Sequence, residues 1–237
     1  MHLRPRRAAA ATGLLAVLAL AGCTGGDDAE ADPDEATPAE VMEVAEDTLA
    51  QTSGLRIDLA ADALPDGVQG LSAARGVITD APAFDGTITI IFGGSNVDVP
   101  VVSVDDTVHA QIPLTTGWSE VDPAEYGAPD PARLLDPDSG LPSLLGHTEG
   151  PEKGESVRGG EDNREVLTEY TGTVPGDAVS QVIPSATGDS FDAAYTVTDD
   201  GELREAVLTG VFYPDSEPMT YTVGLDDYGT EREITAP

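Results

Sequence analysis

Hydrophobic and polar residues alternate along most of the chain beyond residue 54, a pattern typical of strands that bury one face. In the first run, Leu55, Ile57 and Leu59 alternate with charged residues. Turn residues separate the later runs at 93–96, 105–106 and 199–201, and a last alternating run extends from Met219 to Leu225. We predict roughly nine or ten antiparallel strands joined by short turns.

Three segments follow a helical period instead. Thr37 to Glu40 has an N-cap threonine, a proline at the first helical position and a capping glutamate, and we expect Gly54 to end this helix. Its predicted apolar stripe comprises Val41, Val44, Ala45, Thr48 and Leu49. Asp130 caps broken helices around residues 137–142, and a short helix is predicted between residues 175 and 184. The fold class is therefore α+β with an antiparallel sheet.

The N-terminus has the features of a bacterial lipoprotein leader. Three arginines precede an apolar stretch at residues 8–20, which is too short to span a bilayer, and Leu-Ala-Gly-Cys follows at 20–23. We predict cleavage after Gly22 and a diacylglycerol anchor on Cys23. An ordinary signal peptide with a chance cysteine is the alternative, but the only cysteine of the chain stands directly after the apolar run.

Composition sets the remaining domain boundaries. Residues 24–37 contain six acids and no large apolar side chain, so we predict that residues 23–36 form a lipidated, flexible tether and that 37–237 form the folded domain. The chain has 44 acidic and 11 basic residues, a formal charge of −33, which argues against nucleic-acid binding. A single cysteine excludes an internal disulfide scaffold.

Candidate catalytic residues are scarce. Without the leader, His109 and His147 are the histidines that remain, and we expect the first on a strand surface and the second at a helix C-terminus. No Gly-x-Ser-x-Gly motif is present. Asp136 begins an Asp-x-Asp-x-Gly sequence, but its twelfth position is His147 rather than the glutamate of an EF-hand. We therefore predict no enzyme activity, no catalytic residues, no metal site and no cofactor.

Three sequence segments carry a family resemblance: Gly93 to Val99, Trp118, and Asp130 to Leu145, which reads DPARLLDPDSGLPSLL. They resemble the LppX/LprA/LprF/LprG family of actinobacterial lipoproteins, and the 130–145 segment is most similar to the LprG type. The order of lipobox, tether, helix, strands and closing hairpins agrees over the whole mature chain.

The resemblance implies a strongly curved antiparallel sheet, a half-open β-barrel, with helices on its concave face enclosing an apolar cavity. It also implies a non-enzymatic carrier that binds the acyl chains of an acylated glycolipid or lipoglycan and helps to transfer them across the cell envelope. We expect this carrier to be anchored by Cys23 at the extracytoplasmic face of the plasma membrane. The resemblance also implies an exporter of the major facilitator class as its partner.

Apolar residues on the predicted strands and broken helices are the candidates to line such a cavity, although each is equally compatible with ordinary packed core. They are Ile88, Ile90, Phe92, Val97, Val99, Val101, Leu134, Leu135, Leu141, Leu144 and Leu145. Basic residues that could meet a phosphate are few, with Arg56, Arg75 and Arg133 the nearest candidates. The loop from Ala63 to Leu71 has no assigned role.

Two other function classes stay open. In one, the domain has a filled core and displays an acidic surface to an envelope partner. In the other, it is a hydrolase with an unidentified acidic pair, because so many carboxylates make pairs inevitable.

Overall fold

A computed structural model describes residues 36–113, 115–160 and 163–237, and within these parts eleven strands form one antiparallel sheet. The strands of the first half are β1 (Gly54–Ala61), β2 (Leu71–Thr79), β3 (Ala83–Phe92), β4 (Ser95–Val104), β5 (Thr107–Ala110) and β6 (Ser119–Val121). Those of the second half are β7 (Glu149–Gly159), β8 (Glu165–Pro175), β9 (Ser190–Thr198), β10 (Leu203–Gly210) and β11 (Met219–Asp226). The predicted leader, Cys23 and most of the tether lie outside the described residues.

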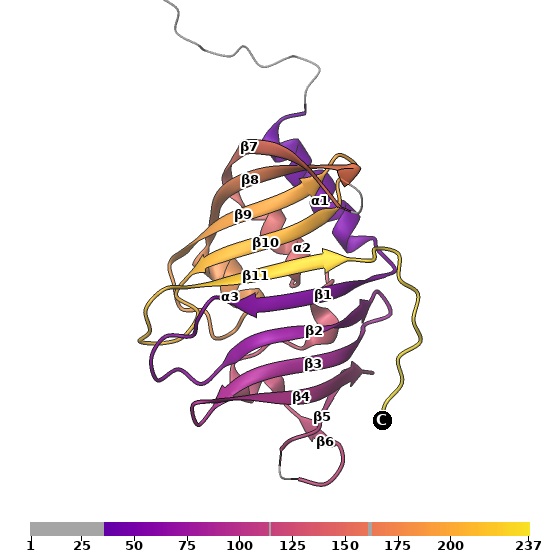
Figure 1. The fold of residues 1–237 in the computed structure, drawn as a ribbon, viewed down its shortest axis with the longest axis vertical. Coiled ribbons are helices and arrows are strands. Elements are labelled where there is room, and N and C mark those ends of the chain that lie inside the picture. The colour runs from indigo at the N-terminus through magenta and orange to yellow at the C-terminus, as the bar shows by residue number, and fades with distance from the viewer. Residues whose placement is uncertain (1–35, 114, 161–162) are drawn as a thin grey trace, which may run out of the picture. The chain divides into compact units, whose positions relative to one another are not determined.

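The strand order is β6-β5-β4-β3-β2-β1-β11-β10-β9-β8-β7 (Figure 1). The first and last strands therefore pair in the middle of the sheet, with Ile57 opposite Leu225 and Leu59 opposite Val223. Strands β6 and β7 are the two edges, so the sheet does not close into a barrel. The α+β class and the half-open sheet expected from the resemblance are confirmed.

Short turns connect the strands where the sequence predicts them. Gly93 and Gly94, with φ of 59° and 78°, join β3 to β4, and Asp105 and Asp106, with φ of 53° and 57°, join β4 to β5. Two successive positive φ values match the right-handed twist of a hairpin. The first turn is shorter than predicted, because Ser95 already pairs with Phe92.

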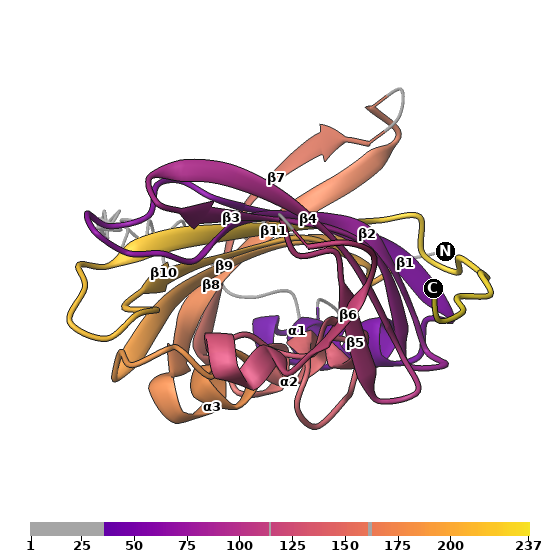
Figure 2. The same ribbon diagram turned by 90° about the horizontal axis from the view of Figure 1, so that it is seen from below.

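The helices lie on the concave face of the curved sheet (Figure 2). They are α1 (Pro38–Ala50), α2 (Leu141–Gly146), α3 (Gly176–Val182) and two short 3₁₀ helices, η1 (Pro123–Tyr126) and η2 (Pro131–Arg133). Thr37 and Glu40 form the predicted capping box of α1, and the Asp130 side chain accepts a bond from the Ala132 N–H at the start of η2.

The buried face of α1 differs from the predicted stripe. Met42, Ala45 and Leu49 are buried, whereas 51% of Val44 is exposed. The helix also stops earlier than Gly54, at a C-cap on Gln51, and Gly54 is the first residue of β1.

Glycines allow aromatic rings to pack closely against the backbone on the concave face. Gly76 and Gly86 face each other on β2 and β3, and the Phe84 ring covers both. A Cβ added at Gly76 would lie 2.6 Å from Phe84 Cε2, so a larger residue would clash. Phe84 belongs to a continuous core between sheet and helices, whose largest fully buried side chains include Tyr195, Phe191, Phe212 and Leu49.

Candidate functional site

One end of the concave face carries apolar residues that the core only partly covers. Leu59 and Ala61 on β1, Ile88 and Ile90 on β3, and Val97 on β4 are half-buried and pack against the core. The strand register brings them together: Ile90 pairs with Val97, and Ala74 of β2 pairs with both Leu59 and Ile88. We call these five residues the apolar strip. Three of its members are predicted cavity residues.

The other predicted strand residues occupy different environments. Val99 and Val101 continue the same face of β4 but are buried, with 6% and 3% of each residue exposed. Phe92 has the right period for the concave face, yet 65% of it is exposed. It is the last residue of β3 beside the Gly93–Gly94 turn, so it extends past the covered part of the sheet.

The predicted leucines are divided between core and surface. Leu135, Leu141, Leu144 and Leu145 are buried members of the core, in and before α2, which packs against α1. Leu134 is half-buried instead. The structure therefore brings all the predicted residues except Phe92 to the core or its margin, and whether any of them contacts a ligand stays a prediction.

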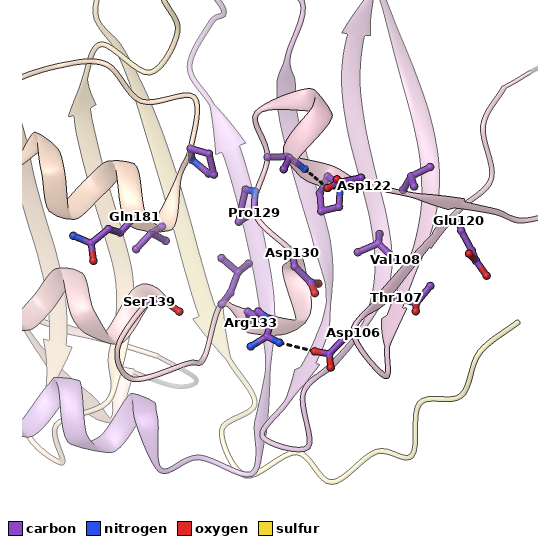
Figure 3. A pocket seen from close by; sticks show the side chains of 17 residues that line it. Asp106, Thr107, Val108, Glu120, Asp122, Pro129, Asp130, Arg133, Ser139 and Gln181 are labelled. Carbon is purple, nitrogen blue, oxygen red and sulfur yellow. Dashed lines mark hydrogen bonds and ion pairs between the residues drawn. The ribbon is translucent and has the colours of Figure 1, made fainter.

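Leu134 also lines a pocket of about 630 Å³ between the β5–β6 edge, the two 3₁₀ helices and α3 (Figure 3). Val108, Val182 and Leu134 form apolar parts of its wall. Its polar lining contains the acids Asp106, Glu120, Asp122 and Asp130, with Arg133 as the cation. This excess of carboxylates disfavours an anionic group in the pocket.

The three arginines considered for phosphate binding either pair with acidic side chains or face away from the core. Arg133 Nη2 lies 2.5 Å from Asp106 Oδ1, and Arg56 Nε lies 3.0 Å from Asp227 Oδ2. Arg75 lies on β2, where its side chain faces away from the core because Ala74 and Gly76 occupy the concave positions. These contacts do not assemble an anion site from the three arginines.

His147 and the Asp136 motif have structural roles. His147 is the C-cap of α2, as predicted, and its Nδ1 lies 2.7 Å from the Ser143 carbonyl oxygen. Asp136 Oδ1 accepts bonds from the N–H groups of Asp138 and Ser139 and from the Ser139 hydroxyl. Burial alone would raise the Asp136 pKa, but these hydrogen bonds and nearby Arg133 lower it below its usual range.

Within the described ranges, no three His, Cys, Asp or Glu side chains are placed to hold a metal ion. The helices of the same residues also include none long and apolar enough to cross a bilayer.

This arrangement of sheet and helices is matched by known proteins. The family model described as LppX_LprAFG lipoprotein matches residues 37–235. The chain belongs to this family. The predicted resemblance is thus confirmed over almost the whole described domain.

Individual family members agree in sequence and structure. The chain is 28% identical to the lipoarabinomannan carrier protein LprG of Mycobacterium tuberculosis over 236 residues, covering 94% of this chain and 91% of the relative. Its fold is similar to the crystal structure of LprF from Mycobacterium bovis, with a TM-score of 0.67 at 15% identity over 84% of this chain and 96% of that one. The Mycobacterium tuberculosis lipoprotein LppX matches with a TM-score of 0.59 at 14% identity, over 84% and 98% of the two chains.

Two members of the strip are not among the predicted cavity residues. Leu59 is predicted on a strand but without a role in the cavity, and Ala61 has no predicted role. Both follow the alternation of Leu55 and Ile57 on β1, so the period itself contained the information. The alternation does not show which strands β1 pairs with. Its neighbours are β2 and β11, and β11 is the last strand of the chain.

Proposed function

We propose that this protein is a carrier that binds the acyl chains of an envelope amphiphile on the concave face of its sheet, at the apolar strip. Membership of a lipoprotein family and similarity to a lipoarabinomannan carrier support this proposal. The observation that carries it is the strip itself, five apolar side chains on the core side of the sheet that stay partly accessible. The core positions of β9 to β11 are by contrast buried, with at most 6% of each residue exposed.

The energetics of acyl chains explain the need for such a surface. Transfer of a methylene from water to an apolar environment contributes about 0.8 kcal/mol, so exposing a few acyl chains of ordinary length to water costs tens of kcal/mol. A carrier has to offset most of this cost and still release its cargo. Dispersed apolar contacts without directional bonds meet both requirements.

The finer features of the proposal come from the lipoprotein leader and from the family resemblance. The lipidated Cys23 would hold the domain at the extracytoplasmic face of the plasma membrane, and residues 24–36 would let the domain extend away from the membrane surface. The cargo would be a glycolipid or lipoglycan whose polar part stays outside the apolar strip, and a major-facilitator exporter would act with the carrier. The carboxylate-rich pocket at the β5–β6 edge favours cargo whose polar part is uncharged there.

A second function is favoured by one observation, the density of the core. Phe84, Phe191, Phe212 and Tyr195 fill the space between sheet and helices, with 2% or less of each residue exposed. A domain filled in this way can serve as a display module for an envelope partner without carrying lipid. The acidic surface would then be the recognition element.

One experiment separates these functions. Residues 36–237 contain every described strand and helix and the whole described core, so they can be expressed without Cys23. The purified domain is extracted with organic solvent for mass spectrometry and titrated with cis-parinaric acid, a fatty acid whose fluorescence rises in apolar surroundings. Co-purified acylated lipid or saturable fluorescence supports the carrier. Absence of both refutes it and leaves the display module.

A further inference from the structure

The segment between β1 and β2, residues 62–70, lies at the end of the apolar strip. It leaves β1 directly after Ala61 and enters β2 at Leu71, which pairs with Ile90. Both Ala61 and Ile90 belong to the strip. In Figure 1 this connection and the β10–β11 connection are at the same end of the sheet.

Both ends of the segment are fixed to the sheet, whereas its middle has one local bond. The Asp62 N–H donates to the Thr220 carbonyl at 3.1 Å, and the Ile91 N–H donates to the Gly70 carbonyl at 2.9 Å. Between these points, the Val68 N–H donates to the Pro65 carbonyl at 3.1 Å. A loop with anchored ends and a weakly held middle can swing outwards without disturbing the strands.

Three hydrogen bonds form a closed ring at the second anchor. The Leu71 N–H donates to the Tyr213 hydroxyl at 3.1 Å, and the Tyr221 hydroxyl donates to the Leu71 carbonyl at 2.7 Å. The two hydroxyl oxygens are 2.9 Å apart. Since the Tyr221 proton is used on Leu71, Tyr213 is the donor between the two tyrosines. Each group in the ring therefore has its partner.

Packing and a further hydrogen bond hold the two tyrosines of this hydrogen-bonded ring in place. Tyr221 is buried, and its ring meets the fully buried Phe212 edge to face, with ring centroids 4.8 Å apart. Burial raises the pKa of Tyr221, so its hydroxyl keeps the proton that it donates. The Tyr213 carbonyl accepts a bond from the Ser216 hydroxyl at 2.9 Å, which holds the β10–β11 connection.

Glycine at position 70 is required for the same contact. A Cβ at Gly70 would collide with the Tyr213 ring and hydroxyl, so the backbone of the segment passes directly beneath this tyrosine. Tyr213 thus clamps the segment through both its ring and its hydroxyl.

Leu64 is the apolar side chain that the segment places against the core. It is half-buried and packs on the same cluster as the strip residues. Asp66 and Gly67 nearby are on the solvent side, and Gly67 has a φ of 82° that suits a turn. The segment is therefore amphipathic, with one apolar side chain inwards and a polar turn outwards.

We propose that residues 62–70 form a gate at the end of the apolar strip, in which Leu64 is displaced when an acyl chain enters and Tyr213 is the positioning residue that holds the gate closed. This inference rests on the proposed carrier function. The gate closes again once the chain is inside, so it slows entry and exit alike, and loosening it changes the rates more than the affinity.

The test compares two tyrosine hydroxyls of the domain 36–237. Tyr213→Phe keeps the ring over Gly70 but removes the bonds to Leu71 and Tyr221. Tyr228→Phe is the matched control, because its hydroxyl donates to the Leu203 carbonyl at 2.8 Å, away from the segment. Binding and release of cis-parinaric acid are followed by stopped-flow fluorescence. For Tyr213→Phe we expect both rate constants to rise about three- to tenfold, with the Kd changed less than about twofold.

A purely structural role for Tyr213 predicts a different result. The gate is refuted if the rates of Tyr213→Phe match those of Tyr228→Phe, or if release alone accelerates and the affinity falls in proportion. Thermal unfolding of both variants shows whether they remain folded to a similar extent.

A second measurement tests the gate without any lipid. The domain 36–237 contains no cysteine, so Leu64→Cys provides a unique thiol, and Val157→Cys on the exposed part of β7 is the reference. We expect maleimide to label position 64 more slowly than position 157, and adding Tyr213→Phe to accelerate only position 64. Equal labelling of the two sites, or no acceleration, overturns the gate. If the wild-type domain fails to bind cis-parinaric acid, the carrier function fails, while thiol labelling still decides the gate.

Discussion

Ile88 and Val99 are cross-strand partners on one face of the sheet, yet they differ in burial, and this difference yields a sharp prediction. Ile88 is half-buried in the apolar strip, whereas only 6% of Val99 is exposed. Tryptophan at either position adds the same aromatic group to the same strand pair. Only at position 88 is there partly accessible space to receive it.

The expected magnitudes follow from these environments. Overpacking a filled core costs about 1–3 kcal/mol, so Val99→Trp should lower the Tm of this domain of about 200 residues by about 3–10 °C. Ile88→Trp should lower it by less than about 3 °C, but its ring should exclude two or three lipid methylenes. At about 0.8 kcal/mol each, this loss weakens acyl binding by roughly 30-fold.

Thermal unfolding by circular dichroism and titration with cis-parinaric acid give the two readouts. Equal losses of Tm in both variants would show that position 88 is packed core. A folded Ile88→Trp domain with wild-type affinity would show that acyl chains bind elsewhere, and either result refutes the assignment of the strip.

Three further predictions concern stability, each measured by thermal unfolding. Thr37→Ala removes the capping box of α1 and should cost about 1 kcal/mol; an unchanged Tm would mean that this first turn contributes nothing. Gly76→Ala should be destabilising by about 1–3 kcal/mol because its Cβ meets Phe84, whereas Gly224→Ala, with its nearest atom at 3.7 Å, should be neutral or slightly stabilising; the reverse order would contradict the packing. Burial raises the pKa of Glu46, so the folded state binds its proton more tightly and stability falls as pH rises from the ordinary to the raised pKa. Glu46→Gln should therefore unfold at higher temperature than the wild type at about pH 7 and at a similar temperature near about pH 3, and a constant difference would exclude this cause.

Local features of the fold were predictable because their causes are local. The capping box at Thr37 and Glu40 depends on residues three apart, and the hairpin at Gly93 and Gly94 depends on two positive φ values. Each is encoded in a few neighbouring residues, and the structure confirms both. The C-cap role of His147 follows from its position after a short apolar helix in the same way.

Features that depend on distant partners were not predictable in this way. Val44 has the helical period of the core but is half exposed, while Met42 is buried, because the surface that α1 meets is set by elements much later in the chain. Phe92 has the period of the concave face but lies past its covered area. The strip depends on the pairing of β1 with β2 and β11, and periodicity on one strand does not specify its neighbours.

The pairing of the first and last strands determines the order in which this sheet can form. Strands β1 to β6 and β7 to β11 are each connected as consecutive neighbours, so each half can grow from local hairpins. The seam between them joins Arg56 to Asp226, and β1 cannot obtain its second neighbour until nearly the whole chain is available. Closing so long a loop is slow, and until then one edge of β1 is open to pairing with other chains. A chain truncated before β11 leaves β1 and β10 with open edges, and we therefore expect it to aggregate.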